Sequence, residues 1–68
     1  PTSDLLNIES SELIKSVTIL DLNGKIIESS FVGKNMTVIE VHHLSSGTYL
    51  VEIETLIGDK TRSKFVRR

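Results

Sequence analysis

Residues 43–68 read HLSSGTYLVEIETLIGDKTRSKFVRR, and they contain the clearest strand in the chain. The segment TYLVEIET alternates apolar and polar residues, and successive side chains of a strand point to opposite faces. The residues predicted to face the core are Tyr49, Val51 and Ile53, with Glu52 and Glu54 facing water. This stretch predicts a strand with one buried face, followed by a turn and a final strand over TRSKFVRR.

The same alternation recurs upstream in shorter runs. The predicted strands are LLNIES, SVTILDL, KIIESSF and MTVIEV. SELIK is interpreted as a spacer, VGKN as a turn, and HHLSSG as a corner from which Leu44 reaches the core. Strand-forming residues dominate and no helix of useful length is predicted. The chain is therefore predicted to be all-β, a sandwich of six to seven antiparallel strands.

The turn DLNGK joins two of these strands. A three-residue loop that ends at Gly24 is favoured over a two-residue Asn-Gly loop, with Gly24 in the left-handed position of a G1 bulge. The longer loop places Ile19 opposite Ile27. It also places Asp21 opposite Lys25, and both apolar and opposite-charge cross-strand pairs stabilise a sheet.

The segment LIGDK is the last predicted turn. A two-residue Gly-Asp loop would place Ile53 opposite Lys64. A register one step longer places Ile53 opposite Phe65, and Glu54 opposite Lys64. Because a one-residue slip moves every side chain to the other face, the burial of two apolar residues favours the second register.

Length and composition limit the chain to a small class of proteins. With 68 residues it is one domain, and it contains no cysteine for a disulfide or a thiolate. No apolar run approaches the roughly 20 residues of a membrane span, and no signal peptide is recognisable. Because the chain starts at Pro1 without a methionine, we expect residues 1–68 to be a single domain cut from a larger protein.

Charge is distributed unevenly along the chain. Residues 1–59 carry three Lys/Arg and nine Asp/Glu, a net charge of −6, whereas residues 60–68 carry five Lys/Arg and no acid. Nucleic-acid binding is not expected, because the body is acidic and one Tyr and two Phe leave little for base stacking. An edge strand kept soluble by Lys and Arg explains the basic end without any ligand.

No group of residues predicts catalysis, a metal site or a cofactor. His42 and His43 are adjacent and point to opposite faces of a strand, so they are interpreted as solvated corner residues. The segment 45–47 lacks the frame and the partners of a nucleophile elbow. Glu52 and Glu54 are interpreted as solubilising side chains. The chain is not expected to be an enzyme.

Several stretches together resemble one known family. The motif residues are Asp21, Gly24 and Lys25 in a turn, Leu44, Gly47 and Tyr49 in a corner, and Lys64, Phe65, Val66, Arg67 and Arg68 at the end. The opening PTSDLLNIES also matches. In this order and spacing they resemble the type A C-terminal sorting domains of proteins exported by the type IX secretion system (Por secretion system) of Bacteroidetes.

The resemblance implies an immunoglobulin-like β-sandwich that acts as a non-catalytic signal at the C-terminus of a larger secreted protein. The cargo would be exported through the periplasm, and the outer-membrane type IX machinery would recognise the folded domain. A sortase-like surface protease would then remove the domain and leave the cargo at the cell surface or in the medium. Direct insertion into a membrane is not implied.

The motif residues receive two kinds of predicted role. The predicted recognition residues are Lys64, Phe65, Val66, Arg67 and Arg68, whose charges would meet an acidic receptor face. Among them Phe65 is assigned to the core rather than to contact. Gly47 is predicted to need a positive φ or a close approach, and Tyr49 to anchor the corner through its hydroxyl on a backbone partner.

Two other functions compete with the sorting signal on sequence alone. An immunoglobulin-like binding or adhesion module of a secreted enzyme would take a glycan or a protein, but the absence of Trp makes an aromatic glycan platform hard to build. A structural spacer would not need to end the polypeptide. Two copies of the chain could also pair weakly through exposed strand edges, with the terminal strand as one such edge.

Overall fold

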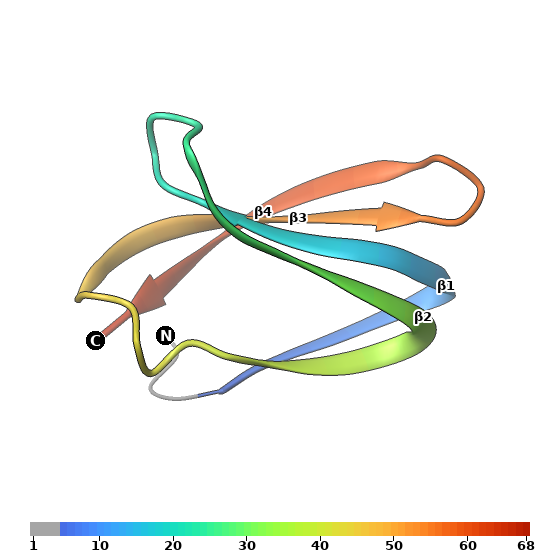
Figure 1. Cartoon of the computed structure of the whole chain (residues 1–68), viewed down its shortest axis with the longest axis horizontal. Coiled ribbons are helices and arrows are strands. Elements are labelled where there is room, and N and C mark those ends of the chain that lie inside the picture. The colour runs from blue at the N-terminus through green and yellow to red at the C-terminus, as the bar shows by residue number, and fades with distance from the viewer. Residues whose placement is uncertain (1–4) are drawn as a thin grey trace.

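The computed structural model describes residues 5–68, which form one antiparallel sheet of four strands (Figure 1). In sheet order the strands are β2 (Ile26–Glu40), β1 (Leu5–Leu20), β3 (Gly47–Thr55) and β4 (Lys60–Arg67). The described residues form no helix, so the predicted all-β class is confirmed. The part of the opening motif that precedes Leu5 lies outside the described residues.

Strands β1 and β2 each run on through a segment that was predicted to interrupt them. SELIK lies within β1, and VGKN lies within β2. Register shifts between Glu9 and Ser16 interrupt the pairing, and Gly33 adopts a φ of 74° in the same region. Bulges bend a strand without ending it. The predicted count of six to seven strands is therefore wrong for the described chain, because two pairs of predicted strands are continuous.

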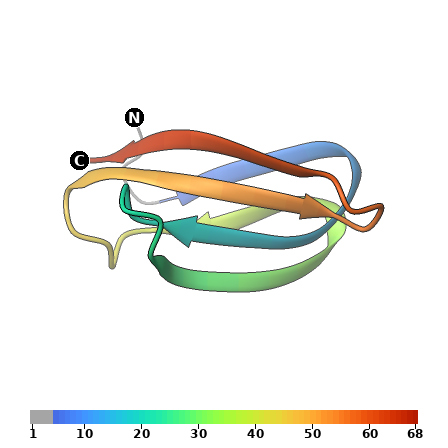
Figure 2. The same cartoon turned by 90° about the horizontal axis from the view of Figure 1, so that it is seen from above.

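The bend folds the β1–β2 hairpin back across the rest of the sheet. The first half of β1 and the second half of β2 form one layer, and β3, β4 and the other halves form the second (Figures 1 and 2). The buried core residues are Ile8, Ile14, Val17, Ile19, Val41, Val51 and Phe65. They come from both layers, so the core fills the space between them. The two layers belong to one bent sheet, and an immunoglobulin-like pair of sheets stays a prediction.

The β1–β2 loop has the three residues that were predicted. The Asp21 amide donates to the Lys25 carbonyl at 2.9 Å, and the Gly24 amide donates to the Asp21 carbonyl at 3.0 Å. The Asp21 carboxylate accepts the amides of Asn23 and Lys25, each at 2.9 Å. Gly24 has a φ of 87°, the left-handed conformation that a G1 bulge requires and that a side chain disfavours.

One predicted partner beyond this loop is wrong. Ile19 lies opposite Glu28 rather than Ile27, because the register shifts between Ile19 and Leu20. Leu20 lies opposite Ile26, so Ile27 is the extra residue of a bulge in β2. Cross-strand pairs contribute only about 0.2–1 kcal/mol each, so a preference for one apolar pair does not prevent a bulge.

The β3–β4 loop repeats the geometry of the first loop. The Thr55 amide donates to the Asp59 carbonyl at 2.9 Å, the Gly58 amide donates to the Thr55 carbonyl at 3.0 Å, and Gly58 has a φ of 97°. The Thr55 hydroxyl takes the place of the Asp21 carboxylate and accepts the Asp59 amide at 3.2 Å. This loop therefore spans residues 56–58, with its glycine in the third position.

Both predicted registers of the β3–β4 hairpin are wrong, because each set the turn too close to the end of the chain. Ile53 lies opposite Thr61, and Phe65 lies opposite Tyr49. The favoured register differs from the structure by four residues, which is an even number, so it still assigned each side chain to the correct face. Phe65 is therefore buried as predicted, but beside a different partner.

Candidate recognition surface

The three sequence motifs meet at one end of the molecule. Leu20 lies opposite Leu50, and Gly47 lies opposite Arg67. The β1–β2 loop, the corner between β2 and β3 and the end of β4 are therefore at the same end, while the β3–β4 loop is at the other (Figure 1). We call the end that contains the β1–β2 loop, the corner and the end of β4 the motif end. It comprises residues 20–25, 41–50 and 64–68.

Tyr49 and Phe65 join β3 to β4 on the inner face of the sheet. Their rings are stacked, with centroids 5.6 Å apart and 24° between the planes. Phe65 is 8% exposed, and Leu44 packs against the same core cluster. The Tyr49 hydroxyl donates to the Ser45 carbonyl at 2.6 Å. The core positions of Phe65 and Leu44 and the backbone partner of Tyr49 are confirmed.

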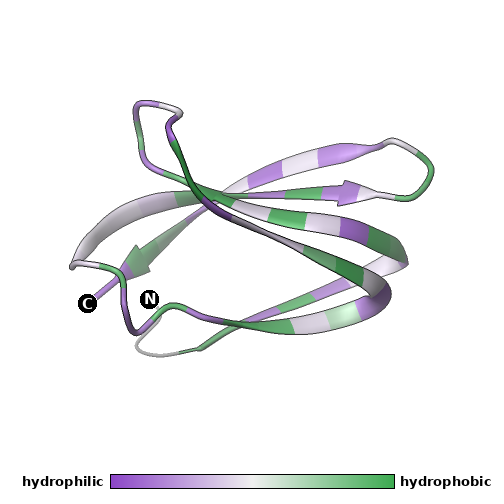
Figure 3. Ribbon diagram, in the orientation of Figure 1, coloured by the Kyte–Doolittle hydropathy of each residue, from purple (hydrophilic) through white to green (hydrophobic). Residues whose placement is uncertain are grey.

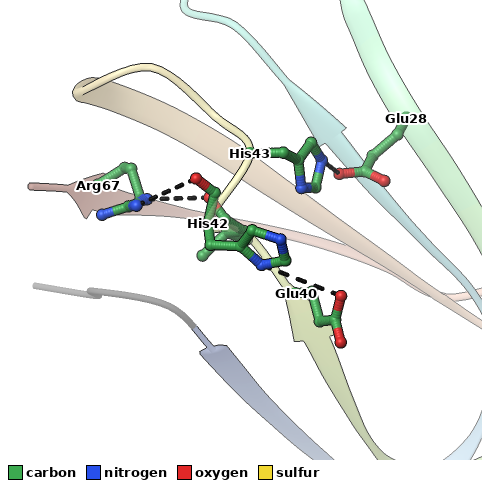
Figure 4. A network of polar contacts seen from close by, with 6 residues as sticks. Glu28, Glu40, His42, His43 and Arg67 are labelled. Carbon is green, nitrogen blue, oxygen red and sulfur yellow. Dashed lines mark hydrogen bonds and ion pairs between the residues drawn. The ribbon is translucent and has the colours of Figure 1, made fainter.

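Arg67 holds the corner against the end of β4 (Figure 4). Its Nε donates to the Val41 carbonyl at 2.9 Å, and a terminal nitrogen donates to the His42 carbonyl at 3.2 Å. The other terminal nitrogen donates to the Arg68 carbonyl. Arginine presents its donors as a planar fork, which allows one side chain to bind several carbonyls at once. This geometry gives Arg67 a structural role in addition to the predicted role in recognition.

The two histidines point from the corner toward carboxylates (Figure 4). His43 Nε2 lies 2.8 Å from Glu28 Oε1, and His42 Nδ1 lies 4.0 Å from Glu40 Oε2. Both imidazoles are exposed at the surface, as predicted. The interpretation of His43 as a merely solvated residue is incomplete, because its contact with Glu28 ties the corner to the start of β2.

The outer face of β4 carries the exposed cations. Lys64 and Arg68 are exposed, and Val66 between them is 42% exposed. Further along the strand, Arg62 Nε donates to Glu52 Oε2 at 2.7 Å across the β3–β4 pair. Surface ion pairs of this kind contribute about 0–1 kcal/mol. The charge of Arg62 is thus partly balanced within the sheet.

Lys64 differs from Arg62 in its surroundings. The residue opposite Lys64 on β3 is Leu50, and Lys60 lies opposite Glu54. The predicted pairing of Lys64 with Glu54 is therefore wrong. Lys64 is an exposed cation at the motif end, and the neighbouring side chain across the strand pair is apolar.

Gly47 begins β3 at the motif end. Its φ is 156°, and a Cβ placed there would meet only the Tyr49 Cε2 atom, at 3.9 Å. The predicted positive φ is confirmed. The alternative explanation, a close approach of neighbouring atoms, does not apply because 3.9 Å is an ordinary van der Waals distance.

Other kinds of site have little support over residues 5–68. In this range no three His, Asp or Glu residues are grouped so that they could hold a metal ion. A hollow of about 430 Å³ takes no residue from the motif end; it is lined by Asn7, Ile8, Glu9, Met36, Thr37 and Val38. The same range contains no helix long and apolar enough to cross a membrane.

The sequence model of the family described as the secretion system C-terminal sorting domain matches residues 1–68. The chain belongs to this family. The resemblance to the type IX sorting domain is thereby confirmed over the whole chain. No curated protein and no solved structure matches the chain.

Membership in the family establishes the general function. The sorting domain carries a C-terminal signal for type IX secretion, which implies interaction with the secretion machinery and export across the outer membrane to the cell surface or the medium. The motif residues by which the chain resembles this family lie together at the motif end. Its stacked rings and backbone contacts give it a fixed shape, and the alternate side chains of β4 face outward.

Sequence reasoning missed the contacts that hold the corner in place. The basic composition of the last residues identified Arg67 as a charge, but no pattern distinguishes an arginine that binds backbone carbonyls from one that is free. The contact between His43 and Glu28 joins residues 15 positions apart and has no local signal. The exposure of Phe31, at 84%, was also not predicted, because alternation alone does not identify the outer edge of a sheet.

Proposed function

We propose that the sorting domain is a non-catalytic address whose recognition surface is the outer face of β4 at the motif end. Its predicted contact residues are Lys64, Val66 and Arg68. The observation that carries the proposal is that these three residues are exposed, whereas their neighbours Phe65 and Arg67 are occupied in packing the core and in binding a backbone carbonyl. A rigid surface loses little conformational freedom on binding, which favours affinity.

The charge of this surface indicates the kind of receptor. Lys64 and Arg68 are exposed cations, and residues 60–68 contain no acid. Complementary charge accelerates encounter and selects the correct partner. We therefore propose an acidic face on the outer-membrane type IX machinery as the receptor. Val66 supplies the apolar contact at the centre of the surface.

The later steps are proposed from the family. The cargo would reach the periplasm, and the machinery would carry it outward with the folded domain attached. A sortase-like surface protease would then remove the domain, with the cargo anchored at the cell surface or released. We also propose that the bent sheet corresponds to an immunoglobulin-like sandwich in which β1 and β2 pass from one sheet to the other, since bulges and bends make such corners.

A transport assay tests the recognition surface. The chain is fused to the C-terminus of a periplasm-targeted fluorescent reporter in a Bacteroidetes host with a working type IX system. The test variant carries Lys64→Ser and Arg68→Ser, and the matched control carries Lys34→Ser and Lys60→Ser, which removes the same charge elsewhere. Deleting the last five residues would be a poorer test, because it would also remove Phe65 from the core.

The expected result is surface or medium reporter for the wild type and the control, with the test variant retained in the periplasm in a protease-resistant form. The same fusions in a strain without the secretion system should all be retained. Export of the test variant at the wild-type level would place recognition elsewhere. Retention of the wild-type fusion would favour the alternative, an immunoglobulin-like binding or adhesion module, which glycan and protein binding screens would then examine.

A further inference from the structure

The two outer edges of the sheet differ sharply in character. Strand β4 carries Lys60, Arg62 and Lys64 along its length. The first half of β2, residues 26–32, contains one charged residue, Glu28, and that carboxylate contacts His43. Charged side chains on an edge strand oppose pairing with another chain. From Ser29 to Val32 the edge of β2 carries no charged side chain.

The same segment of β2 exposes large apolar side chains. Phe31 is 84% exposed, Ile26 is 62% exposed and Ile27 is 39% exposed. Apolar colouring is visible along this part of the strand in Figure 3. Among the described strands β2 pairs with β1 alone, so the backbone of its other edge is available. An apolar strand with a free edge is a template for strand addition.

We infer that two copies of the sorting domain pair through this edge, β2 against β2, about a two-fold axis through Ser29. In a continuous antiparallel sheet a two-fold axis perpendicular to the sheet places one residue opposite itself. With Ser29 at the axis, Ile27 lies opposite Phe31 of the second copy. Glu28 then lies opposite Ser30, so no like charges meet.

The registers in which two β4 strands could pair disfavour β4 as the interface. An axis through any of the residues 61–64 places cations opposite one another, for example Lys64 opposite Arg62 when the axis passes through Ser63. Like charges directly opposite destabilise a strand pair. The first half of β1 is also unpaired on one side and exposes Leu5 and Leu13, but the exposed side chains between these two residues are all polar and include the charged Glu9 and Glu12.

The consequence is a continuous sheet of eight strands with a β4 strand at each outer edge. Both recognition surfaces remain uncovered, and they lie far apart on opposite sides of the dimer. This inference does not depend on the proposed receptor contacts, because it uses residues of β2 that lie outside the recognition surface. A dimer and a failed export assay could therefore both be observed.

Cysteine cross-linking tests the interface directly, because the chain contains no cysteine of its own. In the variant Ser29→Cys the two thiols meet at the axis, where opposite Cα atoms are about 4.5–5.5 Å apart, and a disulfide accepts about 4.4–6.8 Å. Ser63→Cys is the matched control on β4, since both serines are exposed. Under mild oxidation Ser29→Cys should become mostly a covalent dimer, and Ser63→Cys should stay a monomer.

A second pair of variants tests the apolar contact. Light scattering after gel filtration, over a range of protein concentrations, should show a reversible dimer for the wild type. Phe31→Lys should weaken that dimer at least about tenfold, because it places a charge in the interface. Val66→Lys on β4 should leave it unchanged. A wild type that stays monomeric, a dimer that tolerates Phe31→Lys, or preferential cross-linking through Ser63→Cys would each overturn the inference. Pairing of this edge with a strand of a different protein, in place of a second copy of the chain, would also overturn the inference.

Discussion

The two faces of β4 at the motif end show how one short strand separates stability from recognition. On the inner side Phe65 stacks on Tyr49, and Arg67 binds the carbonyls of the corner. On the outer side Lys64 and Val66 face solvent. Because successive residues of a strand point to opposite faces, four consecutive residues divide between two roles. Substitutions at neighbouring positions should therefore have very different effects.

The largest expected effect is on the inner face. Phe65→Ala removes a buried aromatic ring, which costs about 3–5 kcal/mol. A chain of this length has a free energy of unfolding of about 3–10 kcal/mol, so the variant should lose a large part of its stability. Urea denaturation followed by circular dichroism measures the change. Val66→Ala, on the outer face, is the control and should differ from the wild type by less than about 0.5 kcal/mol. Similar losses for both variants would contradict the division of the strand.

The hairpin loops should show the next largest effect. Gly58→Ala places a side chain at a φ of 97°, which should lower the free energy of unfolding by about 1–2 kcal/mol. No neighbouring atom lies within 4 Å of the added methyl group, so the cost is that of the backbone alone. Gly24→Ala, in the matching position of the other loop, should cost about the same. Thermal melts of both variants would show whether the two loops are equivalent. A cost at one glycine only would refute their common geometry.

Arg67 allows charge to be separated from hydrogen-bonding geometry. Arg67→Lys keeps the positive charge but loses the planar fork that binds the corner, so we expect a loss of about 1 kcal/mol in stability. Export of a fused reporter should be retained if recognition depends on the outer face. Arg67→Gln, which loses the charge as well, serves as the comparison. Loss of export with Arg67→Lys, at a temperature where the domain stays folded, would show that the receptor reads this guanidinium.

The smallest effect on stability is expected at Lys64. Lys64→Ser should leave the free energy of unfolding within about 0.5 kcal/mol of the wild type, because the side chain is exposed and lies opposite Leu50. The same substitution should weaken binding to the secretion machinery. Binding of the variant should also depend less on salt concentration than binding of the wild type, because one charge is missing. A melt and a pull-down at two salt concentrations give both quantities. An unchanged pull-down would remove Lys64 from the recognition surface.

The sequence predicts the faces of strands in this molecule better than their partners. Alternation placed Tyr49, Val51 and Ile53 on the inner face, and all three pack in or against the core. The Asp21–Lys25 pair was predicted correctly, but the predicted partner of Ile19 and the register of the second hairpin were wrong, because bulges and loop position alter pairing at a cost of only a few tenths of a kcal/mol to about 1 kcal/mol. Local patterns do not resolve differences of that size.

The bend in β1 has a signal in the pattern of apolar residues. Ile14 lies in the segment interpreted as a spacer, yet it is completely buried. Buried positions change from even numbers, at Ile8 and Ile14, to odd numbers, at Val17 and Ile19. A shift in parity within an apolar pattern indicates a bulge in a continuous strand as readily as a break between two strands. The contacts of Arg67 with the corner, in contrast, depend on the tertiary fold and have no such signal.

The place of Phe65 in the core has a consequence for the timing of folding. The ribosome makes β4 after the other three strands, and a chain interrupted before Phe65 lacks one of the seven residues of the core cluster. A domain this small has little stability to spare, so an interrupted chain should stay unfolded and open to proteases. A folded sorting domain would then be present only on molecules in which synthesis of the cargo, on the N-terminal side of the domain, had been completed before export.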